Sequence, residues 1–384
     1  MDFNTIYSQI KENSLFGRYV TNNHIKPIID TLSHQFKIET IGYSVQKKPI
    51  YSVKFGNGKT KILMWSQMHG NESTTTKAVF DLFNFVELNS EEAVFIKNNY
   101  TLLCIPILNP DGAELYTREN ANQIDLNRDA VNLSQPESLV LKHIYYQFQP
   151  DFCYNLHDQR SIYAAGNTNN PATVSFLAPA YNEAREFNKV RILATSVIVA
   201  MNEELQKYIP NQVGRFDDSF NINCVGETFQ SLNTPTILFE AGHFQNDYQR
   251  EQTRKFIWIA LIVGIKNSND NEVVLTKIDN YLTIPQNEVL FNDFIYRKFK
   301  INANNTNLII SFAANYEEIL TEGEVVFQAV CTEVDELIQN FGHQEYNGGE
   351  GIYTDDFENM PKIDQKVNFY LNKSIKFVNG LKEM

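Results

Sequence analysis

The chain has 384 residues, of which 43% are hydrophobic, and a formal net charge of -13. Its lysines and arginines are scattered without a basic block, so neither nucleic acid nor an anionic membrane is an expected partner. No apolar run approaches the roughly 18 residues that span a bilayer, and the first residues lack the pattern of a signal peptide. We therefore expect a cytoplasmic protein, of an oligomeric state that the sequence leaves open. The four cysteines form no CxxC pair, so no sulfur-bound zinc site is visible.

Residues 1 to about 268 alternate between predicted strands and predicted helices. The first 35 residues look helical, and the patterns that follow predict strands at 38–41, 50–55, 61–67, 100–108, 152–156 and 236–239. The helices expected among them cover residues 74–88, 136–148, 182–205 and 248–265. Strands that alternate with helices predict an α/β sheet with helices on both faces.

The composition changes near residues 266–271, a polar stretch that we interpret as a linker. Short β-like runs follow, separated by turn residues, at 273–275, 289–299, 308–312 and 325–330. We therefore expect a large α/β domain over residues 1–268 and a small β-rich domain over residues 269–384.

Two of the seven histidines lie where predicted strands end. His69 comes shortly after the strand predicted at 61–67, with Glu72 three residues on, and His157 follows the run 152–156. In open α/β sheets, sites form outside the carboxyl ends of strands. Imidazole and carboxylate both bind zinc at about 2 Å, and three such ligands leave a fourth position open for water, as in catalytic sites. We predict one zinc ion per chain, held by His69, Glu72 and His157.

A zinc hydrolase also needs a base that takes a proton from the attacking water. Glu240 is the candidate, because it follows the strand predicted at 236–239 and precedes Ala241-Gly242, which leaves space around it. A carboxylate in this place can instead cap a helix or pair with an arginine. His243, three residues on, is an alternative ligand, which we disfavour since the set of three is already complete.

A polar segment between the two ligand regions supplies candidate substrate anchors. It contains Arg118, Asp125, Asn127 and Arg128, in that order, after a turn at 109–112. The planar fork of arginine matches a carboxylate or a developing oxyanion. Two arginines and an amide near zinc therefore indicate an anionic group beside the scissile bond. Asp125 is a candidate to accept a hydrogen bond from a zinc-bound imidazole.

In combination these motifs resemble the zinc metallocarboxypeptidase family of the carboxypeptidase A type. The likeness runs from about residue 36 to 265 and rests on His69-x-x-Glu72, Asn-Pro-Asp-Gly at 109–112, Asn-Arg at 127–128, His157 and Glu240. The resemblance implies a mixed eight-stranded sheet sandwiched by helices.

The resemblance also implies roles for the site residues. His69, Glu72 and His157 would bind zinc, and Glu240 would be the catalytic base. Asn127 and Arg128 would grip the terminal carboxylate of the substrate. Arg118 would polarise the scissile carbonyl and steady the oxyanion, while Asp125 would buttress a zinc-bound histidine.

One region departs from that family. Its members usually carry a mobile tyrosine upstream of the base, and residues 214–220 contain none here. Related deacylases, of the succinylglutamate desuccinylase and aspartoacylase type, keep the zinc set and the base without that tyrosine, and they carry a small β domain. The long segment between Asn-Pro-Asp-Gly and Asn-Arg favours the carboxypeptidases.

We therefore expect a zinc hydrolase that cleaves an amide bond next to a free carboxylate. The favoured activity is that of a metallocarboxypeptidase acting on peptides, with cell-wall peptides among the candidate substrates. A deacylase of N-acyl amino acids and a non-catalytic binding protein on the same fold are the alternatives. The expected partner is a peptide or acyl-amino-acid substrate with a free carboxylate.

Overall fold

The computed structural model describes residues 1–88, 90–269, 276–303, 306–357 and 359–383. The chain divides into two compact units, of which the first comprises residues 1–159 and 172–287 and the second comprises residues 160–171 and 288–384. A segment that interrupts the first unit in sequence therefore belongs to the second. The domain boundary expected at residue 268 stays a prediction, and the strand expected at 273–275 lies outside the described residues.

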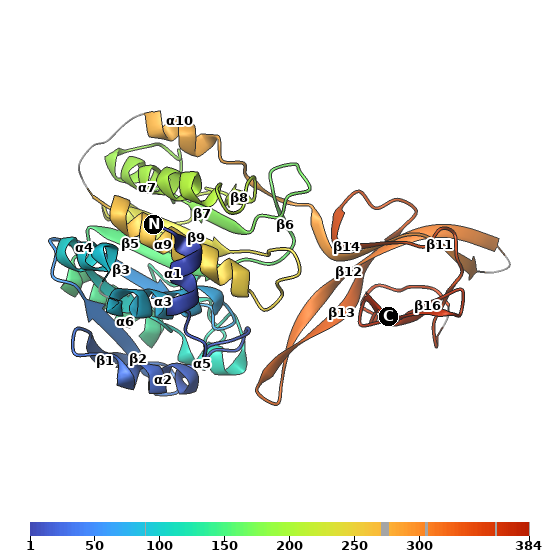
Figure 1. The fold of residues 1–384 in the computed structure, drawn as a ribbon, viewed down its shortest axis with the longest axis horizontal. Helices are drawn as coiled ribbons and strands as arrows, with labels where there is room; N and C mark the ends of the chain where they lie inside the picture. The colour runs from blue at the N-terminus through green and yellow to red at the C-terminus, as the bar shows by residue number, and fades with distance from the viewer. Residues whose placement is uncertain (89, 270–275, 304–305, 358, 384) are drawn as a thin grey trace. The chain divides into compact units, whose positions relative to one another are not determined.

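An eight-stranded mixed sheet runs through the first unit, in the order β1-β2-β4-β3-β5-β9-β7-β8 (Figure 1). Strands β4, β3, β5 and β9 are parallel, whereas β1, β2 and β7 pair antiparallel with a neighbour. The strands are β1 (Lys37–Tyr43), β2 (Pro49–Phe55), β3 (Thr60–Ser66), β4 (Tyr100–Ile105), β5 (Phe152–Asp158), β7 (Val174–Leu177), β8 (Val213–Arg215) and β9 (Thr236–Ala241). The predicted α/β class with a mixed eight-stranded sheet is confirmed.

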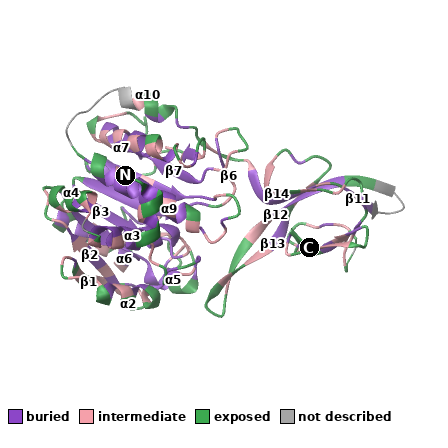
Figure 2. Ribbon diagram, viewed as in Figure 1, coloured by how far each residue is buried: buried purple, intermediate pink, exposed green. Residues whose placement is uncertain are grey.

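Helices cover both faces of this sheet, which is why its central strands are buried along nearly their whole length (Figure 2). One face carries α1 (Phe3–Ile10), α2 (Asn22–Thr31), α3 (Thr74–Glu87), α7 (Lys189–Leu205) and α9 (Glu251–Asn267), which form the larger core. The other face carries α6 (Pro136–Phe148) and α8 (Val225–Ser231). The remaining α-helices of the described residues are α4 (Glu91–Asn99), α5 (Pro110–Leu115) and α10 (Thr276–Leu282).

The helix predicted from residue 182 is wrong at its start, because α7 begins at Lys189. Asn188 caps this helix, since its side chain accepts a hydrogen bond from the amide of Arg191. Arg185, inside the predicted span, has a left-handed φ of 54°, which no α-helix accommodates. The polar stretch before Lys189 therefore forms a loop.

The second unit is rich in β-structure, as predicted. One four-stranded sheet has the order β13-β12-β11-β14, and another has the order β15-β16-β17-β18. Their bounds are β11 (Phe291–Ala303), β12 (Thr306–Thr321), β13 (Glu324–Asp335), β14 (Phe341–Asn347), β15 (Tyr353–Thr354), β16 (Phe369–Leu371), β17 (Ile375–Val378) and β18 (Leu381–Lys382). The core of this unit is largely aromatic, with Phe369 and Phe377 stacked at 4.4 Å between ring centroids.

The segment 160–171 is held in the second unit by backbone pairing. Its strand β6 (Tyr163–Ala165) pairs with β10 (Asn287–Val289). The carbonyl of Ile162 accepts hydrogen bonds from the amides of Leu290 and Phe291. His343 Nε2 donates to the carbonyl of Ser161 over 2.8 Å. The loop that leaves β5 is thus built into the C-terminal unit.

The four cysteines are all free and buried. Among the helices of the described ranges, none combines the length and the apolar character that crossing a membrane requires.

A buried ion pair fixes α3 against α9. Arg254 donates to both carboxylate oxygens of Asp81, over 2.7 and 2.5 Å, and both side chains are fully buried. The same guanidinium donates to the carbonyls of Glu12 and Leu15, so the N-terminal segment is tied to both helices. The orientation of α3 bears on the predicted metal site, because the helix begins two residues after the predicted ligand Glu72.

We expect Asp81→Ala to lower the free energy of unfolding by about 3–5 kcal/mol, since it leaves the Arg254 charge buried without its counter-ion. Urea unfolding followed by the fluorescence of Trp65 and Trp258, both in the first unit, measures this loss. Asp30→Ala, which breaks an exposed pair with Lys26, is the control and should cost less than about 1 kcal/mol. Equal losses in the two variants would contradict this account of α3.

Candidate metal centre

The predicted ligands lie at the carboxyl ends of two adjacent parallel strands. The pairing of β3 with β5 runs up to Ser66 opposite Leu156. The next residue of β5 is His157, and the chain beyond β3 turns through His69 to Glu72, just before α3. The register of β3 and β5 therefore brings the ends of both segments together.

The turn that carries His69 is held by polar contacts and by a close backbone approach. Gln67, with a φ of 44°, donates from its side chain to the carbonyls of Gly70 and Val20 over 2.8 and 3.0 Å. A Cβ at Gly70 would lie 1.9 Å from the carbonyl carbon of Gly112, so only glycine fits there. The Asn-Pro-Asp-Gly motif thus packs directly on the ligand turn.

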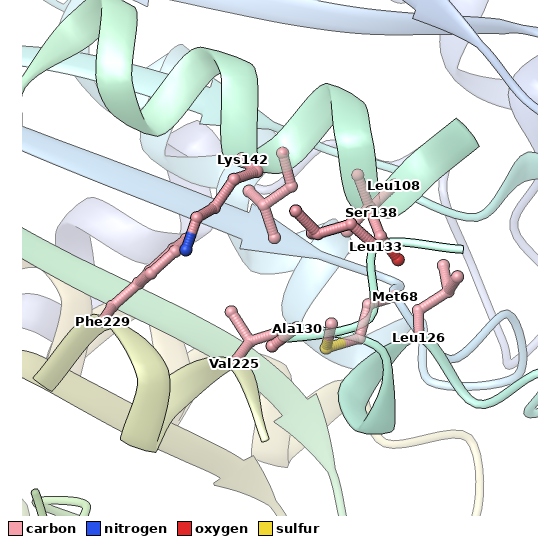
Figure 3. A pocket seen from close by; sticks show the side chains of 10 residues that line it. Met68, Leu108, Leu126, Ala130, Leu133, Ser138, Lys142, Val225 and Phe229 are labelled. Carbon is pink, nitrogen blue, oxygen red and sulfur yellow. The ribbon is translucent and has the colours of Figure 1, made fainter. Parts of the chain in front are cut away.

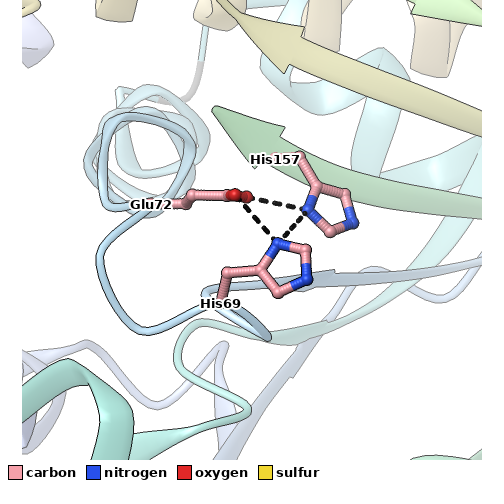
Figure 4. Close-up of side chains that lie close together, drawn as sticks. All are labelled: His69, Glu72 and His157. Atoms are coloured by element: carbon pink, nitrogen blue, oxygen red, sulfur yellow. Dashed lines mark hydrogen bonds and ion pairs between the residues drawn. The ribbon is translucent and has the colours of Figure 1, made fainter. Parts of the chain in front are cut away.

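The donor atoms of the three residues converge (Figure 4). Glu72 Oε1 lies 2.8 Å from His69 Nδ1, and Glu72 Oε2 lies 2.8 Å from His157 Nδ1. The two Nδ1 atoms are 3.1 Å apart. His69, Glu72 and His157 form the metal-capable group found among the described residues, and Figure 4 shows them facing one another.

These separations fit a single zinc ion. Tetrahedral zinc with ligand bonds of about 2.0–2.1 Å holds its donor atoms about 3.3 Å apart, close to the spacing observed. The protonation pattern fits as well. His69 Nε2 lies 3.0 Å from Asp125 Oδ1, and a proton on Nε2 leaves the Nδ1 lone pair free. Arg118 Nη1, which can only donate, lies 3.2 Å from that Nδ1, in agreement with this tautomer.

The electrostatics of the group favour a cation. Burial alone would raise the pKa of the Glu72 carboxyl, but the imidazoles of His69 and His157 hold that pKa below its usual range. Burial lowers the pKa of His157, which keeps its imidazole in the neutral form that binds metal. Burial also opposes charging of His69, but Glu72 and Asp125 outweigh it and raise its pKa. A metal ion bound here would be stabilised by the same negative charges of Glu72 and Asp125.

Asp125 and Arg118 lie beside the metal group. Asp125 Oδ2 accepts hydrogen bonds from Arg118 Nε and Nη2, over 3.1 and 2.9 Å, while its Oδ1 faces His69. This bidentate pair leaves Arg118 Nη1 directed at Glu72 Oε1, at 3.4 Å. The third guanidinium nitrogen, Nη1, therefore points to Glu72 and so toward the position of the metal.

Glu240 stands next to His157 across the sheet. The two residues are register partners on the parallel strands β5 and β9, so their side chains lie on the same face. Burial raises the pKa of Glu240 well above its usual value, and the negative charges of Glu72 and Asp158 raise it further. Its Oε2 is buried and makes no hydrogen bond within the part of the chain that the structure describes.

Asn127 and Arg128 lie in a 3-10 turn that Asp125 begins. The Asp125 carboxylate accepts from the amide of Asn127 over 2.8 Å. Asn127 Oδ1 accepts from the amide of Val225, the first residue of α8, over 3.1 Å. Arg128 donates to the carbonyl of Asn127 and is exposed. The one segment thus reaches the metal ligand His69, the helix α8 and solvent.

Two further residues bear on the site. His243, the disfavoured alternative ligand, stays outside the metal group and lies with its ring 4.6 Å from that of Tyr248. Glu227, which the sequence analysis did not single out, is a buried carboxyl on α8. Burial raises the pKa of Glu227 to about 7, opposed by the charges of Arg128 and Arg191. The closeness of Glu227 to Arg128 depends on where α8 lies in the folded chain, so the sequence alone does not show it.

An apolar hollow is lined by Met68, Leu126, Val225 and Phe229 among others, and Met68 directly precedes the metal ligand His69 in the chain (Figure 3). Its free volume is about 10 Å³. That is room for about one water molecule.

Known proteins share both the fold of this chain and its metal-ligand motif. The zinc carboxypeptidase family model matches residues 22–200, which include all three metal ligands. Residues 22–200 are thus similar to the zinc carboxypeptidase family. The metal of the site is accordingly zinc, held by His69, Glu72 and His157. Glu240 lies beyond the matched residues, so its assignment rests on the register with His157.

The relatives found are distant. A probable carboxypeptidase 2 of Arthroderma benhamiae is 28% identical over 113 residues, which are 29% of this chain and 21% of that protein. Carboxypeptidase SOL1 of Arabidopsis thaliana is 29% identical over 146 residues, 32% of this chain and 30% of that protein. The matched segment thus spans only about a fifth to a third of the length of these two relatives.

Solved structures show the same fold. A putative carboxypeptidase A from Shewanella denitrificans superposes with a TM-score of 0.54 at 18% identity, covering 65% of this chain and 70% of that one. Carboxypeptidase A from Helicoverpa armigera gives 0.52 at 15% identity, with 69% and 79% covered.

We expect His157→Ala to abolish stoichiometric zinc binding, because one imidazole and one carboxylate cannot hold the ion against dialysis. Metal analysis of the purified variant measures this. His143→Ala removes an exposed imidazole on α6 and should retain one zinc per chain. A His157→Ala variant that still carries one zinc would contradict the ligand set.

Proposed function

We propose that this chain is a metallocarboxypeptidase that hydrolyses the amide bond next to the free terminal carboxylate of a peptide, with cell-wall peptides among the candidates. The observation that carries the proposal is the row formed by Glu72, His157 and Glu240. The Glu72 carboxylate faces the His157 imidazole, and Glu240 lies beside His157 on the next parallel strand, with an Oε2 atom that has no hydrogen-bond partner among the described residues. These three residues combine two ligands of the metal with a base.

Zinc, when bound, supplies a Lewis acid that polarises a carbonyl and acidifies water. Glu240 accepts a proton from the attacking water and delivers it to the leaving amine nitrogen as the carbon–nitrogen bond breaks. Its raised pKa makes it a stronger proton acceptor than an exposed carboxylate. The missing hydrogen-bond partner of Oε2 is consistent with a group that holds and releases a proton.

Arg118 stabilises the oxyanion that forms on the scissile carbonyl. Asp125 fixes the guanidinium through Nε and Nη2, so Nη1 is held in place toward the metal ligands. A donor that is already oriented costs no reorganisation when charge develops in the transition state. Asn127 and Arg128 hold the terminal carboxylate of the substrate through charge-assisted hydrogen bonds.

Deacylation of an N-acyl amino acid is the second candidate. It is favoured by residues 214–220, which carry no tyrosine that could close over a substrate. Asp218 in this segment pairs with Arg191 of α7 over 2.6 Å, and that guanidinium is fully buried. The segment is thereby fastened to α7. The small C-terminal β unit agrees with this candidate too.

A substrate panel separates the two candidates. One set of peptides ends in a free carboxylate, a matched set ends in a carboxamide, and a third set consists of N-acyl amino acids. We expect release of the terminal residue from the free peptides and at least tenfold slower release from the carboxamides, which lack the charge that Arg128 would bind. Turnover of the N-acyl amino acids alone would contradict the peptidase and support the deacylase.

Glu240→Gln should retain one zinc per chain and lose turnover by about 10²–10⁴-fold or more, since the amide cannot accept the proton. Steady-state rates combined with metal analysis measure both properties. Glu137→Gln is the matched control, because Glu137 is a buried carboxyl that accepts from Val45 and Asn120. It should leave turnover within a few-fold of wild type. Activity that survives Glu240→Gln would refute the base.

A further inference from the structure

Asp158 directly follows the zinc ligand His157 and contacts both Glu72 and the start of α3. It is the last residue of β5, it is buried, and its side chain leaves the sheet on the face opposite to His157. On that face the first turn of α3 lies against it.

The side chain of Asp158 caps α3. Its Oδ2 accepts from the amide of Thr74 over 3.0 Å, and its Oδ1 accepts from the amide of Thr75 over 3.4 Å. The residue at the N-cap position, Ser73, makes no capping hydrogen bond and instead donates its hydroxyl to the carbonyl of Arg18. A carboxylate at a helix N-terminus satisfies free amides and interacts favourably with the helix dipole. The cap of α3 thus comes from a distant strand.

The backbone of Asp158 binds the ligand carboxylate. Its amide donates to Glu72 Oε2 over 3.2 Å. This amide is available because the pairing of β5 with β3 ends at Leu156, whereas the pairing with β9 continues to Asp158. The carboxylate of Glu72 occupies the position that a longer β3 would have filled.

One residue therefore joins both ligand segments. Glu72 stands two positions before Thr74, and His157 stands one position before Asp158. Through Asp158, the start of α3 and the carboxylate of Glu72 are both fastened to the end of the strand that carries His157. We propose that Asp158 is a positioning residue of the zinc site, which sets the distance between Glu72 and His157.

The charges around Asp158 allow it to stay buried. Arg18 and Arg250 are near enough to interact with its carboxylate electrostatically. Arg250 is itself fixed, since it donates to the carbonyls of Ala241 and Gln159. A buried carboxylate is costly unless it has hydrogen bonds and nearby opposite charges. Asp158 has both, in the two amides of α3 and in the two arginines.

The inference rests on the same zinc site as the proposed function, but its test is metal binding. The test can therefore fail while peptide hydrolysis stands, and hydrolysis can fail while the test succeeds. Asp158→Asn keeps the size of the side chain and replaces one acceptor oxygen with a donor that faces an amide of α3. Asp247→Asn is the matched control, because Asp247 is also buried and caps α9 through the amides of Glu251, Gln252 and Thr253.

The measurement is the zinc dissociation constant of the full chain, from competition with a chromophoric chelator, together with the melting temperature of the metal-free protein. We expect Asp158→Asn to weaken zinc binding about 10–100-fold, as for other groups that orient ligands. Asp247→Asn should stay within twofold of wild type even where its melting temperature falls equally. The visible spectrum of the cobalt(II) form should change in Asp158→Asn alone.

Two results would overturn the proposal: a zinc dissociation constant of Asp158→Asn within twofold of wild type, or equal weakening in Asp247→Asn. Asp158→Ser, which retains one acceptor in a smaller side chain, is the second variant in case Asp158→Asn does not fold. The same expected and contrary results apply to it.

Discussion

The close approach of two imidazole nitrogens, 3.1 Å apart and both facing one carboxylate, is the interaction on which the rest of this structure depends. Buried donor atoms gathered in this way are stabilised by a shared cation, and the spacing matches that of zinc ligands. The surroundings support it. Asp125 directs the lone pair of His69 inward, and Asp158 holds Glu72 at the end of β5. Both contacts position side chains that bind the metal.

The register of three parallel strands explains how the sequence reaches this arrangement. Strands β3, β5 and β9 are neighbours in the centre of the sheet, buried by helices on both faces. Their carboxyl ends lie together, so His69, His157 and Glu240 meet although they are far apart in the chain. The ion pair of Asp81 with Arg254 orients α3. In this way a buried contact far from zinc bears on the position of Glu72.

Much of the fold and of the zinc set could be predicted, because each feature has a local signature. The apolar runs before His69, His157 and Glu240 mark buried strands, and a polar residue after such a run points to a site. Other features have no such signature. Strands β7 and β8 have four and three residues, too short for a periodic pattern. The helix predicted from residue 182 was wrong because the cap at Asn188 depends on one side-chain hydrogen bond.

The contacts of Asp158 and Glu227 could not be predicted, since they depend on where α3 and α8 lie after folding. The sequence also did not indicate that residues 160–171 join the C-terminal unit, because the pairing partners of β6 follow more than a hundred residues later. Long-range contacts of this kind leave no trace in local composition or periodicity.

X-ray absorption at the zinc edge of the purified protein tests the central claim most directly. This account predicts nitrogen and oxygen ligands only, at about 2.0–2.2 Å, with the scattering pattern of two imidazoles. A sulfur ligand at about 2.3 Å, or the pattern of a single imidazole, would contradict it.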